Sequence, residues 1–140
     1  LASGQIDRKL NEKGHDADAR EAALDRLKSL GLIDDDQVAR QIIRETQRQR
    51  PAGPRLLKQK LRQKGITGVT ADAAIHDLEP EPADAVDQAH ALAEKKWRSD
   101  ARVEPRKRRQ RVYALLMRRG FERDTIDAAM DRLRADDELE

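Results

Sequence analysis

One spacing occurs three times along this 140-residue chain, and it constrains the fold more than any other feature. A leucine is followed after three residues by glycine, after nine more by a large aliphatic residue, and after two more by leucine. The three copies are Leu10, Gly14, Leu24 and Leu27; Leu61, Gly65, Ile75 and Leu78; and Leu116, Gly120, Met130 and Leu133. A spacing repeated in this way predicts a repeat protein.

Each copy is predicted to contain two short helices joined at the glycine. An aliphatic residue lies four positions before each leading leucine, as Ile6 does before Leu10, so both side chains share one helix face. Glycine favours the left-handed conformation just past a helix C-terminus, and the Lys or Arg before it suits the negative end of the helix dipole. A second helix is expected to start at Ala17, Ala71 or Asp124. Such short helices are unstable alone, so each pair must pack on a third element.

Caps and prolines place a third helix in the first two repeats. We interpret Asp34 to Asp36 as an N-terminal helix cap rather than a metal site, since acids favour the positive end of a helix dipole. Pro51 and Pro54 break the chain, as do Pro80 and Pro82, and Pro105 opens the last repeat. The predicted repeats are residues 1–50, 51–99 and 100–140, and the last has its third helix truncated or absent. The predicted fold is all-α.

Composition agrees with small helical repeats. Of the chain, 40% is charged and only 2% is aromatic, so a thin core divided among three units fits better than one large core. The aliphatic residues of the three copies are expected to be buried in three separate small cores. The sequence contains no cysteine, which excludes a disulfide framework and a thiolate zinc site. No apolar run approaches the length of a membrane span and no signal peptide is visible, so a cytoplasmic monomer without a cofactor is expected.

The basic residues are clustered, although the net charge is only +2. Residues 40–64 carry 9 Lys or Arg and one acid, and residues 95–123 carry 12 and 3, whereas residues 65–94 carry none and 7. Because such clustering costs repulsion, it favours an anionic partner over a merely solvated surface. The candidate partner-binding or DNA-binding residues are Arg40, Arg44, Arg48, Arg55, Lys58, Arg62, Lys64, Arg106, Lys107, Arg108, Arg109, Arg111, Arg118 and Arg119. Charge reversal at Arg106, Arg108 and Arg109 is expected to weaken binding and to leave the fold intact. The acidic helix after Gly65 could neutralise Arg55 and Arg62.

Enzymatic functions find little support in the sequence. There is no Gly-x-x-x-x-Gly-Lys-Ser/Thr loop, which excludes a P-loop ATPase. His15, His76 and His90 have no ligand-like spacing relative to one another, and we interpret His76 beside Asp77 as a surface pair. The aromatic residues Trp97, Tyr113 and Phe121 are expected to pack in the core rather than to stack on bases. No catalytic, metal-binding or cofactor-binding residue is predicted.

Two alternative binding functions remain at this point. In a helix-turn-helix transcription factor the helix after the turn enters the major groove, but here the helices after Gly65 and Gly120 are acidic. Sequence-specific reading of the major groove is therefore not expected. A non-enzymatic DNA-binding protein or a helical adaptor for an acidic partner would also use the basic helix faces. Salt-dependent binding to DNA would distinguish the DNA binder from the adaptor.

Several segments in order resemble the RecX family of recombination regulators. The first is Leu32-Ile33-Asp34-Asp35-Asp36-Gln37-Val38-Ala39-Arg40, the second is Gly53-Pro54-Arg55, and the third is Leu61-Arg62-Gln63-Lys64-Gly65-Ile66. Arg118-Arg119-Gly120-Phe121, with the spacing from Ile126 to Leu133, is similar to the C-terminal unit of that family. Each motif is loose, but their order and spacing together are specific, and the resemblance extends from about Gln5 to Leu133.

This resemblance implies both a fold and a function. The fold would be three tandem three-helix repeats in an elongated, curved rod. The function would be binding to RecA recombinase filaments on DNA and inhibition of their ATPase and strand-exchange activity. Such a protein would modulate homologous recombination, DNA repair and the SOS response. Its partners would be the RecA filament and single- or double-stranded DNA without strong sequence preference.

Overall fold

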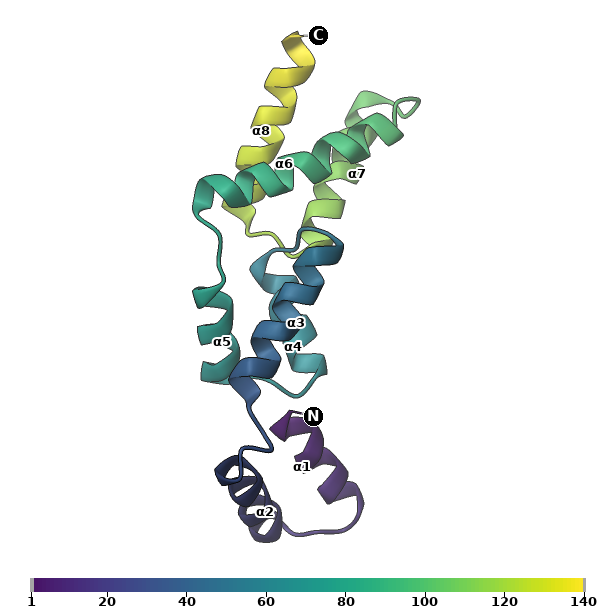
Figure 1. Ribbon diagram of the computed structural model, residues 1–140. Coiled ribbons are helices and arrows are strands. Elements are labelled where there is room, and N and C mark those ends of the chain that lie inside the picture. The colour runs from purple at the N-terminus through teal and green to yellow at the C-terminus, as the bar shows by residue number, and fades with distance from the viewer. Residues whose placement is uncertain (1, 140) are drawn as a thin grey trace. The chain divides into compact units, whose positions relative to one another are not determined.

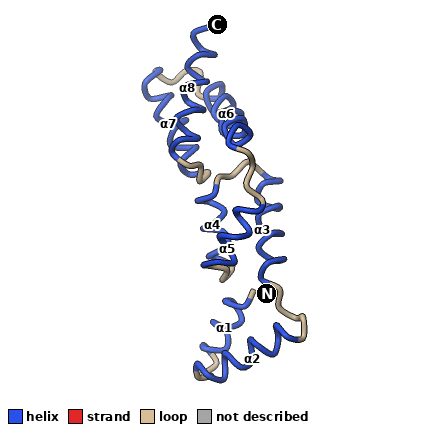
Figure 2. The backbone as a smooth tube through the Cα atoms, turned by 90° about the vertical axis from the view of Figure 1, so that its left-hand side faces the viewer, coloured by secondary structure: helices blue, strands red, loops and turns tan. Residues whose placement is uncertain are grey.

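The computed structural model describes residues 2–139, which form eight α-helices and no strand (Figures 1 and 2). The predicted all-α fold class is therefore confirmed. None of the described helices is long and apolar enough to cross a membrane. The helices are α1 (Ser3–Glu12), α2 (Ala17–Ser29), α3 (Asp35–Gln49), α4 (Pro54–Gln63), α5 (Gly68–Asp77), α6 (Pro82–Ser99), α7 (Pro105–Arg118) and α8 (Arg123–Leu139).

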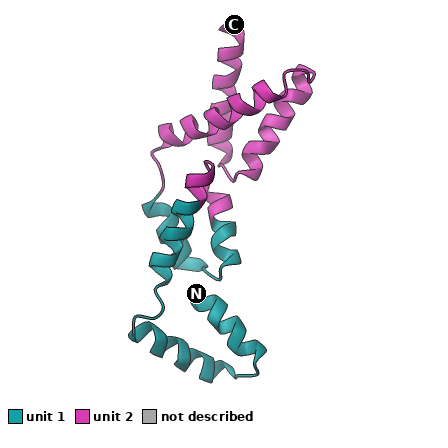
Figure 3. Cartoon of the chain, turned by 45° about the vertical axis from the view of Figure 1, so that its right-hand side comes forward, with its two compact units in different colours: residues 1–45, 58–78 teal, residues 46–57, 79–140 magenta. Residues whose placement is uncertain are grey.

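The chain divides into two compact units (Figure 3). Unit 1 comprises residues 1–45 and 58–78, and unit 2 comprises residues 46–57 and 79–140. The chain passes from one unit to the other within α3, within α4 and between α5 and α6. Within unit 2, α6 packs against both α7 and α8. The repeat boundaries after residues 50 and 99 stay a prediction.

The repeated glycines end the first helix of each pair in the predicted way. Their φ angles are +89° at Gly14, +80° at Gly65 and +82° at Gly120, all in the left-handed region. The amide after each glycine donates a hydrogen bond to the carbonyl of the repeat leucine: His15 to Leu10 at 3.1 Å, Ile66 to Leu61 at 2.9 Å, and Phe121 to Leu116 at 3.3 Å. This is the Schellman arrangement, and it places the glycine four residues after the residue whose carbonyl accepts the hydrogen bond.

Two of these glycines also lie against another segment of backbone. In unit 2, a Cβ added at Gly120 would lie 2.1 Å from the amide nitrogen of Leu56 at the start of α4. Two backbone hydrogen bonds close this contact, from Gly53 to Arg119 at 2.8 Å and from Arg55 to Gly120 at 3.0 Å. In unit 1, a Cβ at Gly65 would similarly lie 2.7 Å from the amide nitrogen of Gln5. The turn of one helix pair is therefore a docking point for the start of an earlier helix.

The core of unit 2 lies between α6, α7 and α8. It includes Phe121, and the predicted core residues Leu116 and Leu133 are 0% and 5% exposed. Trp97, Tyr113 and Met130 are partly buried against it, so the aromatic residues pack as expected. The full cluster is Ala89, Leu92, Ala93, Val112, Leu116, Phe121, Ile126, Ala129 and Leu133.

Burial in unit 1 differs from the prediction. Leu61 is fully buried, but neither α1 nor α2 contains a buried residue. The expectation of a closed core around Leu10, Leu24 and Leu27 was therefore wrong, because these side chains are only half-buried. Two helices packed on each other shield one side of a leucine and leave the other side open. The predicted core residues Ile75, Leu78 and Met130 are half-buried as well.

Because Leu116 is buried and Leu10 is only half-buried, replacing them by alanine should lower the free energy of unfolding by different amounts. Leu116→Ala is expected to lower the free energy of unfolding by about 2 to 5 kcal/mol, as for other fully buried leucines. Leu10→Ala should cost only about 1 to 2 kcal/mol, because the Leu10 side chain is only half-buried. Urea denaturation followed by circular dichroism measures both values. Equal losses for the two variants would show that the α1–α2 pair has a closed core.

Candidate partner-binding surface

Helix α3 carries Arg40, Arg44 and Arg48, which are four residues apart. They share one helix face, and all three are exposed. The Arg40 guanidinium forms an ion pair with Asp77 of α5, with 3.0 Å between the nitrogen and the carboxylate oxygen. Arg44 and Arg48 have no ion-pair partner among the described residues. The α3 face therefore presents two uncompensated charges and one that is partly neutralised.

The acidic helix α5 pairs with different cations from those expected. Besides Arg40, it contacts Lys58, whose Nζ lies 3.5 Å from an oxygen of Asp72. Arg55 and Arg62, the residues at which neutralisation was anticipated, are exposed and form no ion pair within residues 2–139. The exposed side chains of both pairs remain within reach of solvent, so these contacts are weak.

The start of α7 carries the densest positive cluster. Arg106, Lys107 and Arg109 are exposed, and no ion pair involves them in the described part of the chain. Glu104 caps the helix by accepting hydrogen bonds from the amides of Arg106 at 2.9 Å and Lys107 at 3.2 Å. These two hydrogen bonds, and next the nearby positive charges, hold the pKa of Glu104 below its ordinary value. Glu104 therefore caps α7 and lies near the positive charges of Lys107 and Arg109, but among the described residues it forms no ion pair with their side chains.

Arg108 has a different role from its neighbours in the sequence. Its Nε donates a hydrogen bond of 2.7 Å to the carbonyl of Trp97, near the end of α6. Its guanidinium carbon also lies 3.7 Å from the centroid of the Trp97 ring, a cation–π contact. These contacts show that Arg108 takes part in packing, so charge reversal at Arg108 is now expected to destabilise unit 2. Arg108 joins α7 to α6 within unit 2.

Arg119 is likewise held by the protein itself. Its Nε donates to the carbonyl of Pro51 at 3.0 Å and a terminal nitrogen donates to the carbonyl of Arg50 at 2.9 Å. Burial, and then the charge of Arg50, lowers the pKa of Arg119 from its ordinary value. Gln47 holds the same linker through hydrogen bonds of 2.8 and 2.9 Å with the backbone of Ala52. Arg119 therefore stabilises the link between α3 and α4, a use that a count of charges does not reveal.

The remaining candidates fall into two groups. Arg111 lies 4.0 Å from an oxygen of Asp100, at the limit of an ion pair. Lys64 and Arg118 are exposed and have no ion-pair partner among residues 2–139. The uncompensated candidates in the described chain are Arg44, Arg48, Arg55, Arg62, Lys64, Arg106, Lys107, Arg109 and Arg118. Binding by any of these residues stays a prediction.

The acidic run before α3 acts as a cap, as interpreted from the sequence. Asp34 accepts a hydrogen bond of 3.1 Å from the amide of Gln37. Asp35 accepts one of 2.9 Å from the amide of Ser3, at the start of α1. Each carboxylate thus satisfies a helix N-terminal amide, which is the ordinary use of acids at such positions.

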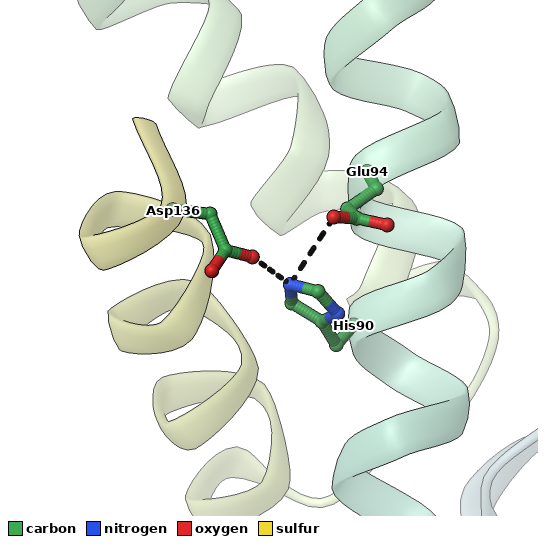
Figure 4. A group of neighbouring side chains, drawn as sticks. All are labelled: His90, Glu94 and Asp136. Carbon is green, nitrogen blue, oxygen red and sulfur yellow. Dashed lines mark hydrogen bonds and ion pairs between the residues drawn. The ribbon is translucent and has the colours of Figure 1, made fainter. Parts of the chain in front are cut away.

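Sequence reasoning missed one cluster of polar side chains. His90 on α6 is buried, and it lies beside Glu94 on the same helix and Asp136 on α8 (Figure 4). The histidines were compared only with one another, so this cluster was not considered. The spacing of His90 and Glu94, four residues apart on one helix, was the available signal. Asp136 could not be added from the sequence, because it comes from another helix.

Comparison with known proteins gives consistent matches. Residues 34–75 match the family model described as RecX, second three-helix domain, and residues 83–130 match RecX, third three-helix domain. The regulatory protein RecX of Pelodictyon phaeoclathratiforme is 32% identical over 90% of this chain and 76% of its own length. That of Prosthecochloris aestuarii is 33% identical over 92% of this chain and 82% of its own.

A solved structure has the same fold. The crystal structure of RecX from Lactobacillus salivarius superimposes with a TM-score of 0.78, covering 96% of this chain and 86% of the other. Sequence identity between the two is 24%, so this match concerns the fold.

Proposed function

The chain belongs to the RecX family of regulatory proteins, and we propose that it binds RecA recombinase filaments on DNA and lowers their ATPase and strand-exchange activity. The observation that carries this proposal is the match with regulatory proteins named RecX over about nine-tenths of the chain. By this action the protein would modulate homologous recombination and DNA repair. It would act by binding, without hydrolysing ATP itself.

The distribution of charge supports an anionic partner. Exposed cations without ion pairs occur on α3, on α4 and at the start of α7. In a fold with so little apolar core, such charges repel one another and do not stabilise the native state. A DNA backbone or an acidic protein surface would remove this repulsion and release counterions. The cluster of Arg106, Lys107 and Arg109 is the strongest candidate for such a contact.

A binding measurement separates the proposed function from its alternatives. Fluorescently labelled protein is titrated with RecA filaments assembled on single-stranded DNA, with the same DNA alone, and with RecA alone. The proposal predicts the tightest binding to the assembled filament. Equal affinity for filament and bare DNA would favour a DNA-binding protein that does not recognise RecA. No binding to either would favour an adaptor for another acidic partner.

Charge reversal at the start of α7 is expected to weaken this binding. Loss of three exposed contacts worth about 0.5 to 1 kcal/mol each would raise the dissociation constant roughly 10- to 100-fold. The triple variant Arg106→Glu, Lys107→Glu, Arg109→Glu should melt near the temperature of the parent protein, because these side chains are exposed. Fluorescence anisotropy at several salt concentrations measures the loss, and the salt dependence should become shallower.

A matched control reverses three positive charges on other helices. Arg8, Lys9 and Arg26 on α1 and α2 are also exposed, and reversing all three gives an equal change in net charge. This control should bind more tightly than the α7 variant. Equal weakening by both triple variants would mean that total charge, and not the α7 cluster, determines affinity. Arg108→Glu, by contrast, should lower the melting temperature because it removes the contacts with Trp97.

A further inference from the structure

A buried histidine in unit 2 faces two carboxylates from two helices (Figure 4). The side chain of His90 is 7% exposed, and its Nε2 lies 2.7 Å from Oδ2 of Asp136 on α8. The same nitrogen lies 3.7 Å from Oε1 of Glu94, one turn further along α6. Three potential ligand atoms thus lie within 4.8 Å of one another.

We propose that His90, Glu94 and Asp136 bind one divalent transition-metal ion of the Zn²⁺ type. An imidazole nitrogen with two carboxylate oxygens is a donor set that such ions accept, whereas Mg²⁺ and Ca²⁺ prefer oxygen ligands alone. His90 and Glu94 are four residues apart, so one helix face presents both. Asp136 supplies the third ligand from α8.

The charges of the cluster favour a cation at this position. Two carboxylates converge on one ring nitrogen, and a single proton on that nitrogen cannot bond fully to both. Arg98 compensates Glu94 only weakly, at 3.9 Å between its nitrogen and a carboxylate oxygen. A divalent ion would balance both carboxylates and would lie between the His90 nitrogen and the two carboxylate oxygens.

The geometry requires only small adjustments. Metal–ligand bonds of about 2.0 to 2.2 Å place the ligand atoms of a tetrahedral site roughly 3.3 to 3.5 Å apart. The distance from His90 Nε2 to Asp136 Oδ2 is 2.7 Å and would have to increase, whereas the distance from His90 Nε2 to Glu94 Oε1 is 3.7 Å and would have to decrease. Each change is less than about 1 Å. Burial fixes the imidazole, while the carboxylates of Glu94 and Asp136 are 35% and 43% exposed and can turn.

A cavity beside the cluster leaves room for the remaining ligand. Its volume is about 200 Å³, and its lining consists of Glu94, Trp97, Arg98, Arg108, Leu133, Asp136 and Asp137. Water can therefore complete the coordination of a three-ligand site, and an ion can enter from solvent. Because the ligands come from α6 and α8, a bound ion would hold the C-terminal half of α8 on α6. The expected result of binding is a more stable unit 2.

The test titrates the full chain, freed of metal by chelation, with Zn²⁺ and with Co²⁺. Calorimetry should give one ion per chain, Co²⁺ should develop visible absorption bands, and Zn²⁺ should raise the melting temperature. Asp136→Asn and Glu94→Gln keep the shape and polarity of the side chains, so both variants should fold. Each should bind at least about tenfold more weakly, the low end of the loss that follows from changing one group at a metal site.

Two controls decide where the ion binds. His15→Gln changes an exposed histidine of unit 1 and should leave the affinity unchanged. Mg²⁺ should not compete at similar concentration. Affinity that survives both Asp136→Asn and Glu94→Gln, or that is lost with His15→Gln, would overturn the proposal and indicate adventitious surface binding. Failure of the parent protein to bind Zn²⁺ would overturn it equally.

Discussion

Replacing Gly120 by alanine is expected to lower the free energy of unfolding by about 3 to 8 kcal/mol, a large part of the stability of an ordinary small domain. Gly120 has a φ of +82°, and an alanine in this region costs about 1 to 2 kcal/mol. The new methyl group would also lie 2.1 Å from the amide nitrogen of Leu56. Because that contact is with backbone, α4 must shift rather than a flexible side chain.

The shift of α4 accounts for the rest of the expected loss. Overpacking of this kind costs about 1 to 3 kcal/mol. The hydrogen bonds from Gly53 to Arg119 and from Arg55 to Gly120 would also weaken, at about 0.5 to 1.5 kcal/mol each. Chemical denaturation followed by circular dichroism measures the sum.

Gly14→Ala is the matched control, because Gly14 occupies the same position in the first helix pair. Its φ is +89°, but a Cβ added there meets no atom within 4 Å. Only the backbone conformation should therefore be penalised, at about 1 to 2 kcal/mol. Gly65→Ala should resemble Gly120→Ala, since its Cβ would lie 2.7 Å from Gln5. Similar losses at all three glycines would contradict the docking role of Gly65 and Gly120.

The helix ends could be predicted from the sequence because their cause is local. Six consecutive residues contain the repeat leucine, the glycine and the residue after the glycine, whose amide donates a hydrogen bond to the leucine carbonyl. The predicted start of the second helix of the second pair was less accurate, since α5 begins at Gly68 and not at Ala71. The close approach of Gly120 to Leu56 could not be predicted, because it joins segments more than sixty residues apart.

Burial could be predicted only where a third helix closes the core. Leu10 and Leu116 occupy equivalent positions in the repeat, yet only Leu116 is buried. In unit 2, α6 covers both α7 and α8, whereas α1 and α2 chiefly shield each other. The spacing of apolar residues predicts which face of a helix is apolar, but it does not predict whether another element covers that face.

The basic runs are visible in the sequence, but the separate uses of their members are not. Arg108 and Arg109 are adjacent in sequence, yet Arg108 contacts Trp97 while Arg109 is exposed. Successive residues of a helix point about 100° apart, so one charge run serves both packing and solvent. The role of Arg119 was hidden for another reason, because its acceptors are carbonyl groups of a distant linker.

The largest functional effect is expected on RecA itself. If the chain binds the assembled filament, saturating protein should reduce DNA-dependent ATP turnover to below about a tenth of the free rate. A tenfold effect needs at least about 1.4 kcal/mol of preference for an inactive filament state, and more when the free filament is mostly active. The α7 triple variant should need roughly 10- to 100-fold more protein for half-inhibition, in proportion to its weaker binding.

The most direct test is a steady-state ATPase assay with RecA, single-stranded DNA and increasing concentrations of the purified chain. The proposed function predicts a saturable fall in turnover, weakened by reversal of Arg106, Lys107 and Arg109 and less affected by reversal of Arg8, Lys9 and Arg26. The chain alone should release no phosphate from ATP. Unchanged turnover at concentrations that saturate filament binding would contradict the proposal that this protein inhibits RecA.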